Sequence, residues 1–152
     1  LLNLPRILVV DEPTAGLDPR ERIRFRNLLV ELSRNRIVIF STHIIEDIAS
    51  SCNQVGVINK GILKYNGTPS DMANIAKDVT WTFEVPVRDF AKLPSDMLIV
   101  HHIRQGDIIK VRCLSEHKPT ETAEKILPAL EDSYLWLLRS VKIENKEEII
   151  TQ

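Results

Sequence analysis

The chain has 152 residues, of which 43% are hydrophobic, so it can bury a core as one domain or as two small ones. Its 20 Lys and Arg residues balance 21 Asp and Glu residues, and this lack of basic surplus argues against a nucleic-acid partner. No apolar run reaches the roughly 20 residues of a membrane-spanning helix, and no stretch has the pattern of a secretion signal. We expect a soluble protein that meets a membrane only through a partner.

The first predicted strand covers Ile7 to Val10, which reads Ile-Leu-Val-Val. Four branched apolar residues in a row predict a short strand that is buried on both faces. Asp11 and Glu12 follow at the point where the strand emerges. The C-terminal ends of parallel strands form ligand crevices, where paired acids can bind a metal and accept a proton. Taken alone, the two acids favour a solvated turn before Pro13.

A helix is predicted next, with Asp18 as its N-cap, Pro19 at its first position and Glu21 completing an arrangement like a capping box. It ends near Arg34 and has apolar residues at helical spacing, namely Ile23, Phe25, Leu28, Leu29 and Leu32. Its arginines are compatible with a nucleic-acid stripe. The acidic residues interspersed among them favour a solvated helix face instead.

The second apolar strand, Ile37 to Phe40, ends in Ser41-Thr42-His43. The short helix that follows has Glu46 and Asp47 near its start, where acidic side chains favour the helix dipole. Further along we predict a strand over 54–59, a Lys-Gly turn, a strand over 62–65 and a short helix capped by Ser70.

These elements together resemble the ATP-binding cassette (ABC) ATPases. The apolar strand, the Asp-Glu pair, Pro-Thr and the Leu-Asp turn resemble the Walker B motif and the D-loop of that family, and His43 resembles its switch histidine. The three pieces occur in the order of the family and at about its spacing, so the combination is specific. The Lys-Gly turn and the Gly-Thr-Pro segment at 67–69 resemble the end of an ABC nucleotide-binding domain, which extends the resemblance over 1–76.

The resemblance implies ATP hydrolysis with ATP and Mg²⁺ as ligands. It assigns Asp11 to Mg²⁺ binding through a water molecule, and Glu12 to the general base that activates the attacking water. It assigns His43 to a hydrogen bond with the γ-phosphate, which keeps the water and Glu12 in register. The D-loop is expected to contact a second ATPase subunit across a nucleotide sandwich, and consists of Ala15, Gly16, Leu17 and Asp18.

The phosphate-binding Walker A loop and the Ser-Gly-Gly signature of the family are absent from this sequence, which has only 5 glycines. Leu1 has no methionine before it and looks like a cut end. The predicted fold is therefore α/β, a partial P-loop NTPase sheet without its Walker A strand, followed by a small α+β domain. Strand edges and apolar faces that the missing strand leaves uncovered should make the chain poorly stable, and the fragment alone is expected to be inactive.

The second domain is predicted over 78–144, with a frayed tail over 145–152. Alternating residues around Trp81 and Phe83 predict a half-buried strand that Pro86 ends. Two more strands, 97–104 and 108–114, are joined across Gly106 as a hairpin. A helix is predicted over 120–138 with a break at Pro128, and its apolar face consists of Ile126, Leu127, Leu130, Tyr134 and Leu137.

Isolated reactive groups in the sequence are weak site candidates. Cys52 and Cys113 lie in apolar patterns without the spacing of metal ligands, which favours buried free thiols in a reducing compartment. His101 and His102 are adjacent on a predicted strand and point to opposite faces, which disfavours a shared metal ion.

The segment Pro128-Ala-Leu-Glu-Asp-Ser-Tyr134 resembles the end of ATPase subunits in ABC exporters of drugs, lipids and antibiotics. We therefore expect the ATP-binding subunit of an exporter, in the cytoplasm at the inner face of the membrane. Its expected partners are a second ATPase subunit, identical or not, and a transmembrane permease. The alternatives are a soluble ABC-type ATPase that acts on ribosomes or DNA, and a binding module formed by 78–144. That second region either senses substrate or packs on the ATPase core or its dimer mate.

Overall fold

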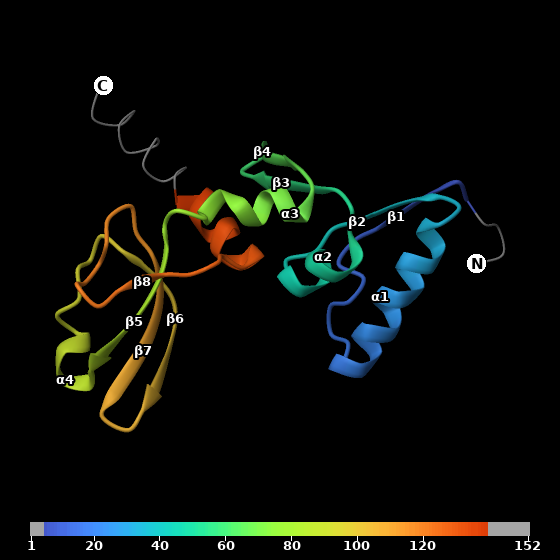
Figure 1. Ribbon diagram of the computed structural model, residues 1–152. Coiled ribbons are helices and arrows are strands. Elements are labelled where there is room, and N and C mark those ends of the chain that lie inside the picture. The colour runs from blue at the N-terminus through green and yellow to red at the C-terminus, as the bar shows by residue number, and fades with distance from the viewer. Residues whose placement is uncertain (1–4, 140–152) are drawn as a thin grey trace. The chain divides into compact units, whose positions relative to one another are not determined.

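The computed structural model describes residues 5–139 (Figure 1). The predicted tail over 145–152, and the end of the domain predicted over 78–144, lie outside the described residues. The described elements are, in order, β1 (Ile7–Val10), α1 (Pro19–Ser33), β2 (Ile37–Phe40), α2 (Ile45–Ser51), β3 (Val55–Asn59), β4 (Ile62–Gly67), α3 (Pro69–Ala73), η1 (Asn74–Ala76), β5 (Thr80–Pro86), α4 (Val87–Phe90), β6 (Leu98–Gln105), β7 (Ile108–Leu114) and β8 (Glu124–Lys125). A last helix occupies 130–139.

The chain divides into two compact units. The first unit runs through Gly56 and takes in Asn66–Pro69, and the second consists of Val57–Tyr65 together with the chain from Ser70 onward. The boundary expected near residue 77 stays a prediction. Among the described residues, no helix has the length and apolar character that crossing a membrane demands.

In the first unit, β1 and β2 form a parallel two-stranded sheet, and α1 is the connection between them. Both strands occupy the predicted residues, and their register pairs Ile7 with Ile37 and Val10 with Phe40. A parallel pair needs a crossover connection of this kind, because its strands run in the same direction. The two C-terminal strand ends therefore lie next to each other.

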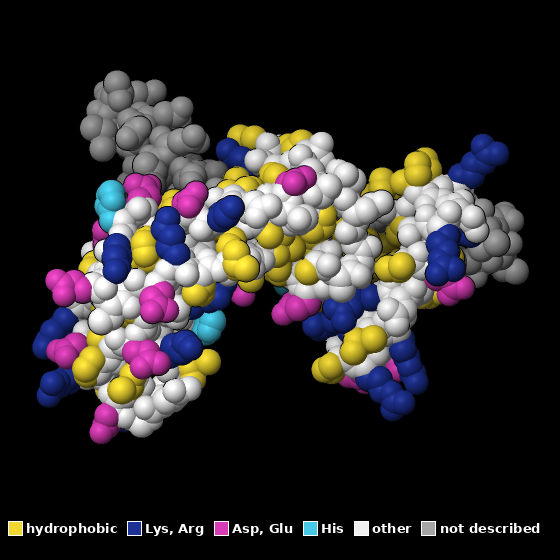
Figure 2. Space-filling view, viewed as in Figure 1, with side chains coloured by type: hydrophobic (Ala, Val, Ile, Leu, Met, Phe, Trp, Pro, Cys, Tyr) yellow, Lys and Arg dark blue, Asp and Glu magenta, His cyan; other side chains and the backbone are white. Residues whose placement is uncertain are grey.

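The prediction that β1 is buried on both faces is wrong. Alternate residues of both strands face solvent, with exposed fractions of 55% for Ile7, 68% for Val9, 58% for Ile37 and 53% for Ile39. The reason is that burial depends on neighbouring elements, and the sheet described here has two strands. Hydrophobic side chains reach the surface in Figure 2. Uncovered apolar faces are what we expected of a sheet without its Walker A strand.

Helix α1 starts and ends close to the predicted residues. The Asp18 carboxylate accepts a hydrogen bond from the backbone N–H of Glu21 at 2.8 Å, and Pro19 occupies the first turn. The Glu21 side chain pairs with Arg24 at 2.9 Å, outside the cap. Within the helix only Leu29 is buried, so most of its predicted apolar stripe is partly exposed.

The hairpin of β3 and β4 turns at Lys60 and Gly61, whose φ angles of 50° and 77° suit a tight hairpin turn with two left-handed residues. The following helix α3 begins at Pro69, so the prediction of Ser70 as its N-cap is wrong. Proline is favoured at a first helical position because its fixed φ fits the helix and its missing N–H needs no partner there.

The second unit contains a four-stranded sheet in the order β6-β7-β5-β8, and its neighbouring strands are antiparallel. The hairpin of β6 and β7 matches the prediction. One face of the sheet carries a hydrophobic core, and the indole N–H of Trp81 donates to the Ser115 carbonyl at 3.0 Å. The buried core residues are Trp81, Phe83, Val85, Met97, Ile109, Val111, Cys113 and Ala123.

The helix predicted over 120–138 is only half correct. Residues 124–125 form β8, in which Lys125 pairs with Trp81, and the helix begins at Leu130. Pro128 explains the difference, because it has no N–H and disfavours helical backbone at the residue before it. That residue, Leu127, is 83% exposed, so its predicted place on the apolar face is wrong.

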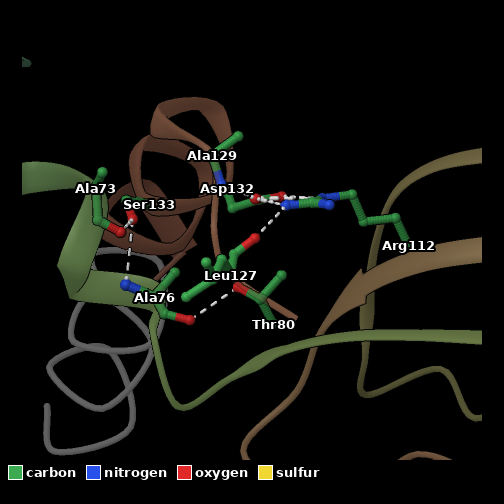
Figure 3. A network of polar contacts seen from close by, with 8 residues as sticks. All are labelled: Ala73, Ala76, Thr80, Arg112, Leu127, Ala129, Asp132 and Ser133. Carbon is green, nitrogen blue, oxygen red and sulfur yellow. Dashed lines mark hydrogen bonds and ion pairs between the residues drawn. The ribbon is translucent and has the colours of Figure 1, made fainter. Parts of the chain in front are cut away.

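Asp132 fixes the start of this last helix (Figure 3). Its carboxylate is 1% exposed and accepts hydrogen bonds from the Ala129 N–H at 2.6 Å and from Arg112 at 2.5 Å. The contact with Ala129 is the reciprocal half of a capping box, in which the third helical residue bonds back to the cap. The hydrogen bonds with Asp132 raise the pKa of Arg112 above its usual value.

Ser133 anchors the same helix to the segment before β5 (Figure 3). Its hydroxyl donates to the Ala73 carbonyl at 2.7 Å and accepts from the Ala76 N–H at 3.1 Å. Thr80, the first residue of β5, is buried. Its hydroxyl donates to the Ala76 carbonyl at 2.8 Å, which compensates for the loss of water. Asp132 and Ser133 therefore have structural roles within the Leu-Glu-Asp-Ser segment.

Candidate active site

The candidate site lies at the C-terminal edge of the β1–β2 sheet. Because Val10 is paired with Phe40, the residues that follow the two strands emerge side by side. The Ser41 N–H continues the pairing by donating to the Val10 carbonyl at 3.1 Å. The register thus brings the Asp-Glu pair together with the Ser-Thr-His segment, about 30 residues away in the sequence.

Ser41 contacts both acidic residues. Its hydroxyl donates to the Asp11 carboxylate and accepts from the Glu12 backbone N–H at 3.0 Å. Ser41 belongs to the Ser-Thr-His segment, but no pattern in the sequence assigns it a role. The signal available was positional, because it is the first polar residue after β2. In the structure it orients Asp11 and fixes the backbone that carries Glu12.

Glu12 and His43 lie within hydrogen-bond distance, with 2.9 Å between the Glu12 Oε2 and the His43 Nδ1. The Glu12 side chain is 36% exposed and the His43 side chain 75%, so water reaches both groups. Their arrangement places a proton acceptor beside an imidazole that is able to donate or accept.

The backbone of Glu12 has a φ of 44°, in the left-handed region that residues other than glycine seldom adopt. Conformations of this kind are held in place by surrounding contacts and cluster at functional sites. Here the contact is with Ser41, which accepts the N–H of Glu12. The backbone geometry is therefore a second feature that marks Glu12, independent of its side chain.

The predicted D-loop folds as a compact turn after Glu12. The Ala15 N–H donates to the Glu12 carbonyl at 3.0 Å, and the Leu17 N–H donates to the Thr14 carbonyl at 3.3 Å. Gly16 has a φ of 75°, which a glycine adopts without strain. Ala15, Gly16 and Asp18 are exposed and Leu17 is half-buried, so the turn presents a free surface. Its contact with a second subunit stays a prediction.

Next to this turn lies a buried polar cluster that we did not predict from the sequence. Asp47 is 0% exposed and accepts hydrogen bonds from the Thr14 hydroxyl at 2.5 Å and from Arg26 at 3.3 Å. Arg26 also donates to the Glu46 carbonyl at 3.3 Å. From the sequence we expected Asp47 only to favour the dipole of its helix. Nothing in the apolar spacing of α2 distinguishes a buried acid from a solvated one at this position.

The donor set fits Mg²⁺ and a nucleotide in part. Asp11 offers exposed carboxylate oxygen, which is the ligand type that Mg²⁺ prefers. Backbone N–H groups in a glycine-rich loop before a helix bind phosphate groups, and this sequence contains no such motif. The residues present therefore suit the metal and the attacking water, whereas a nucleotide needs further phosphate-binding groups.

Known proteins similar to the chain are ATP-binding proteins of ABC transporters. One from Mycoplasma pneumoniae is 41% identical over 80 residues, which are 51% of this chain and 24% of the relative. The energy-coupling factor transporter ATP-binding protein EcfA2 of Streptococcus pneumoniae is 43% identical over 82 residues, 53% of this chain and 28% of the relative. The uncharacterised ABC transporter ATP-binding protein YxlF of Bacillus subtilis is 31% identical over 85 residues, 56% of this chain and 29% of the relative.

The chain thus spans about a quarter to a third of the length of the curated relatives it matches. The aligned stretches of 80 to 85 residues have about the length of the resemblance expected over 1–76. None of the known protein-family profiles matches the chain. A solved metal-chelate type ABC transporter in an inward-facing conformation is 20% identical, over 73% of this chain and 41% of that one, with a TM-score of 0.43. We draw nothing from that score.

Proposed function

We propose that this chain carries the carboxylate and histidine half of the ATP-hydrolysing site in an ABC transporter subunit. The observation that supports this most directly is the meeting of Asp11, Glu12 and His43 at one edge of the β1–β2 sheet. Its relatives carry the same description, ATP-binding proteins of ABC transporters. These names also favour a transporter over a soluble ATPase that acts on ribosomes or DNA.

In this proposal each residue has a separate task. Asp11, oriented by Ser41, would hold Mg²⁺, and the bound metal would supply positive charge opposite the phosphates. Glu12 accepts the proton of the attacking water, because its carboxylate is open to solvent at the strand end. His43 donates to the Glu12 carboxylate from its Nδ1 and so keeps Glu12 in register, and in its protonated form it also donates to the γ-phosphate from Nε2.

The complete subunit needs further parts that this sequence does not carry. We propose that a phosphate loop and a signature segment complete the site, that a second ATPase subunit contacts the D-loop, and that a permease holds the pair at the inner face of the cell membrane. The chain alone then neither binds nor hydrolyses ATP with measurable efficiency. The Leu-Glu-Asp-Ser segment supports an exporter, whereas the named relatives include an energy-coupling factor transporter and do not favour that type.

The test of the catalytic assignment is Glu12→Gln in the complete protein, because glutamine keeps the shape of the side chain and removes the base. We expect ATP binding to persist and steady-state turnover to fall by about a thousandfold or more. Glu31→Gln is the matched control, since Glu31 is an exposed acid on α1, and it should keep normal turnover. Hydrolysis by the Glu12→Gln protein at the parent rate would refute the assignment.

Calorimetry with magnesium-ATP tests the half-site interpretation on the 152-residue chain itself. We expect no binding by the parent chain or by Glu12→Gln, which is included so that turnover cannot obscure the heats. Saturable binding by both would reveal a phosphate-binding site within this sequence, and the half-site interpretation would have to be abandoned.

A further inference from the structure

Asp47 is the least exposed acidic residue of the first unit, at 0%, yet it lies in the first turn of a seven-residue helix. A buried carboxylate is strongly unfavourable unless hydrogen bonds and an opposite charge compensate for lost water. Both compensations are present, from the Thr14 hydroxyl at 2.5 Å and from the guanidinium of Arg26 at 3.3 Å. The Thr14 side chain is itself 1% exposed, so this contact is shielded from water.

Thr14 lies in the segment that carries Glu12, and Asp47 lies in the segment that carries His43. Thr14 is two residues after Glu12, and Asp47 is four residues after His43. Besides the contacts of Ser41 with Asp11 and Glu12, the segments are joined by the contact of 2.9 Å between Glu12 and His43 and by the buried contact between Thr14 and Asp47. Short stretches of backbone connect the two contacts into a closed ring.

The two contacts differ in their exposure to solvent. The His43 side chain is 75% exposed, and a polar or charged pair that is in contact with solvent contributes little free energy to keeping its two groups together. A hydrogen bond to a buried charge is stronger, and its loss leaves an uncompensated group. The buried contact of Thr14 with Asp47 therefore holds the two segments more firmly than the exposed contact of Glu12 with His43 does.

We propose that Asp47 is a positioning residue for the candidate active site. By accepting the Thr14 hydroxyl and the Arg26 guanidinium, it holds the segment that carries His43 against the start of the D-loop, so that His43 stays within reach of Glu12. This inference rests on the proposed function. Asp47 does not touch substrate in this scheme, and it acts through the two segments that it joins.

Steady-state kinetics of the complete protein test the inference with Asp47→Asn and Thr14→Val, which remove the charge or the hydroxyl with little change of volume. We expect kcat to fall about tenfold or more, because small displacements of reacting groups lower rates steeply. The KM for ATP should change by less than about twofold, since the phosphate loop that we propose to supply most of the nucleotide binding is not among the residues that Asp47 positions. Thr14→Ser keeps a hydroxyl and should restore most of the parent kcat.

The matched control is Asp132→Asn, which alters a buried acid that is paired with an arginine in the second unit. It should lower the unfolding temperature and leave kcat unchanged. The double variant of Thr14→Val and Asp47→Asn should be no slower than the slower of the two single variants, because both changes act through the same contact.

Three results would overturn the inference. They are a parent-like kcat for Thr14→Val, a Thr14→Ser protein as slow as Thr14→Val, or an equal loss of kcat in Asp132→Asn. If Asp47→Asn does not fold, the two Thr14 variants decide. Inactive Glu12→Gln with fully active Thr14→Val refutes only the positioning role, whereas active Glu12→Gln refutes the proposed function and this inference with it.

Discussion

Strands of similar apolar composition are buried in the second unit of the chain and partly exposed in the first. In the second unit, β7 contributes residues such as Val111 and Leu114 that are 0% exposed. In the first unit, Val9 and Ile39 of the β1–β2 sheet are 68% and 53% exposed. The residue types are alike, and the difference lies in the neighbours that cover each strand. Apolar sequence therefore predicts a strand, but only the surrounding elements determine its burial.

Buried acids extend the comparison. Each unit has a buried aspartate paired with an arginine, Asp47 with Arg26 and Asp132 with Arg112. Arg112 makes several hydrogen bonds to Asp132, the shortest at 2.5 Å, whereas Arg26 reaches Asp47 with one at 3.3 Å. We expect the pair in the second unit to matter more for stability, and the pair in the first unit to matter more for the geometry of the site.

The largest effect on stability is expected from Asp132→Ala. It strands the half-buried Arg112 guanidinium and removes the helix cap, so the free energy of unfolding should fall by about 3–5 kcal/mol. Urea titration followed by tryptophan fluorescence measures this, because Trp81 and Trp136 both belong to the second unit. The exposed pair of Asp89 and Lys92 serves as the control, and Asp89→Ala should lower stability by less than about 1 kcal/mol. Equal losses would contradict the buried role of Asp132.

Truncation of single apolar residues tests the contrast in burial directly. Leu114→Ala should lower the free energy of unfolding by about 3 kcal/mol, because it opens a cavity at a fully buried position. Ile39→Ala removes a similar side chain from an exposed position and should lower stability by less than about 1 kcal/mol. Ile39→Ser should also reduce aggregation of the 152-residue chain, measured by light scattering. A large loss of stability for Ile39→Ala would show that the β1–β2 face is covered in solution.

A smaller effect is expected at the start of α1. Asp18→Ala removes the side-chain cap that accepts the Glu21 N–H, and should destabilise the helix by about 1 kcal/mol. Hydrogen exchange of the amides in the first turn measures the change locally. Asp18→Asn keeps a capping oxygen and should exchange at nearly the parent rate. Fast exchange in both variants would indicate that the cap contributes nothing.

An effect that appears only at high pH concerns Cys113, where burial raises the pKa of the thiol to about 11. Because the folded pKa lies above the ordinary value of 9.0, the thiol contributes stability below pH 9 that is lost as the pH rises to about 11. The midpoint of urea unfolding should therefore fall more steeply over that range in the parent than in Cys113→Ala, which cannot titrate. Identical pH profiles would show that burial does not shift this pKa.

The sequence predicted the elements whose signals are local. Branched apolar runs located β1 and β2, and Asp18 and Pro19 located the start of α1. The resemblance to the ABC ATPases implied that Glu12 and His43 act together. The misses depend on contacts between distant segments. Asp47 looked like an ordinary acid in a first helical turn, because its partners Thr14 and Arg26 are not visible from its neighbours.

The region before the last helix was missed for a related reason. Its residues have helical composition, but β5 offers its edge to 124–125, and the Ile126 N–H donates to the Thr80 carbonyl at 3.1 Å. Pro128 was correctly identified as a break. Before Pro128 the chain forms a strand because the edge of β5 is available for pairing. No local pattern in the sequence reveals that edge.

Glu12 has a left-handed backbone, with a φ of 44°. Selection for a stable fold and selection for the proposed activity should therefore favour different residues at this position. Glycine or asparagine relieves this conformation more readily than glutamate does. Variants chosen only for heat resistance should therefore accumulate Glu12→Gly or Glu12→Asn, and each of these removes the proposed base. In lineages that keep the activity, glutamate should persist at this position despite its strain.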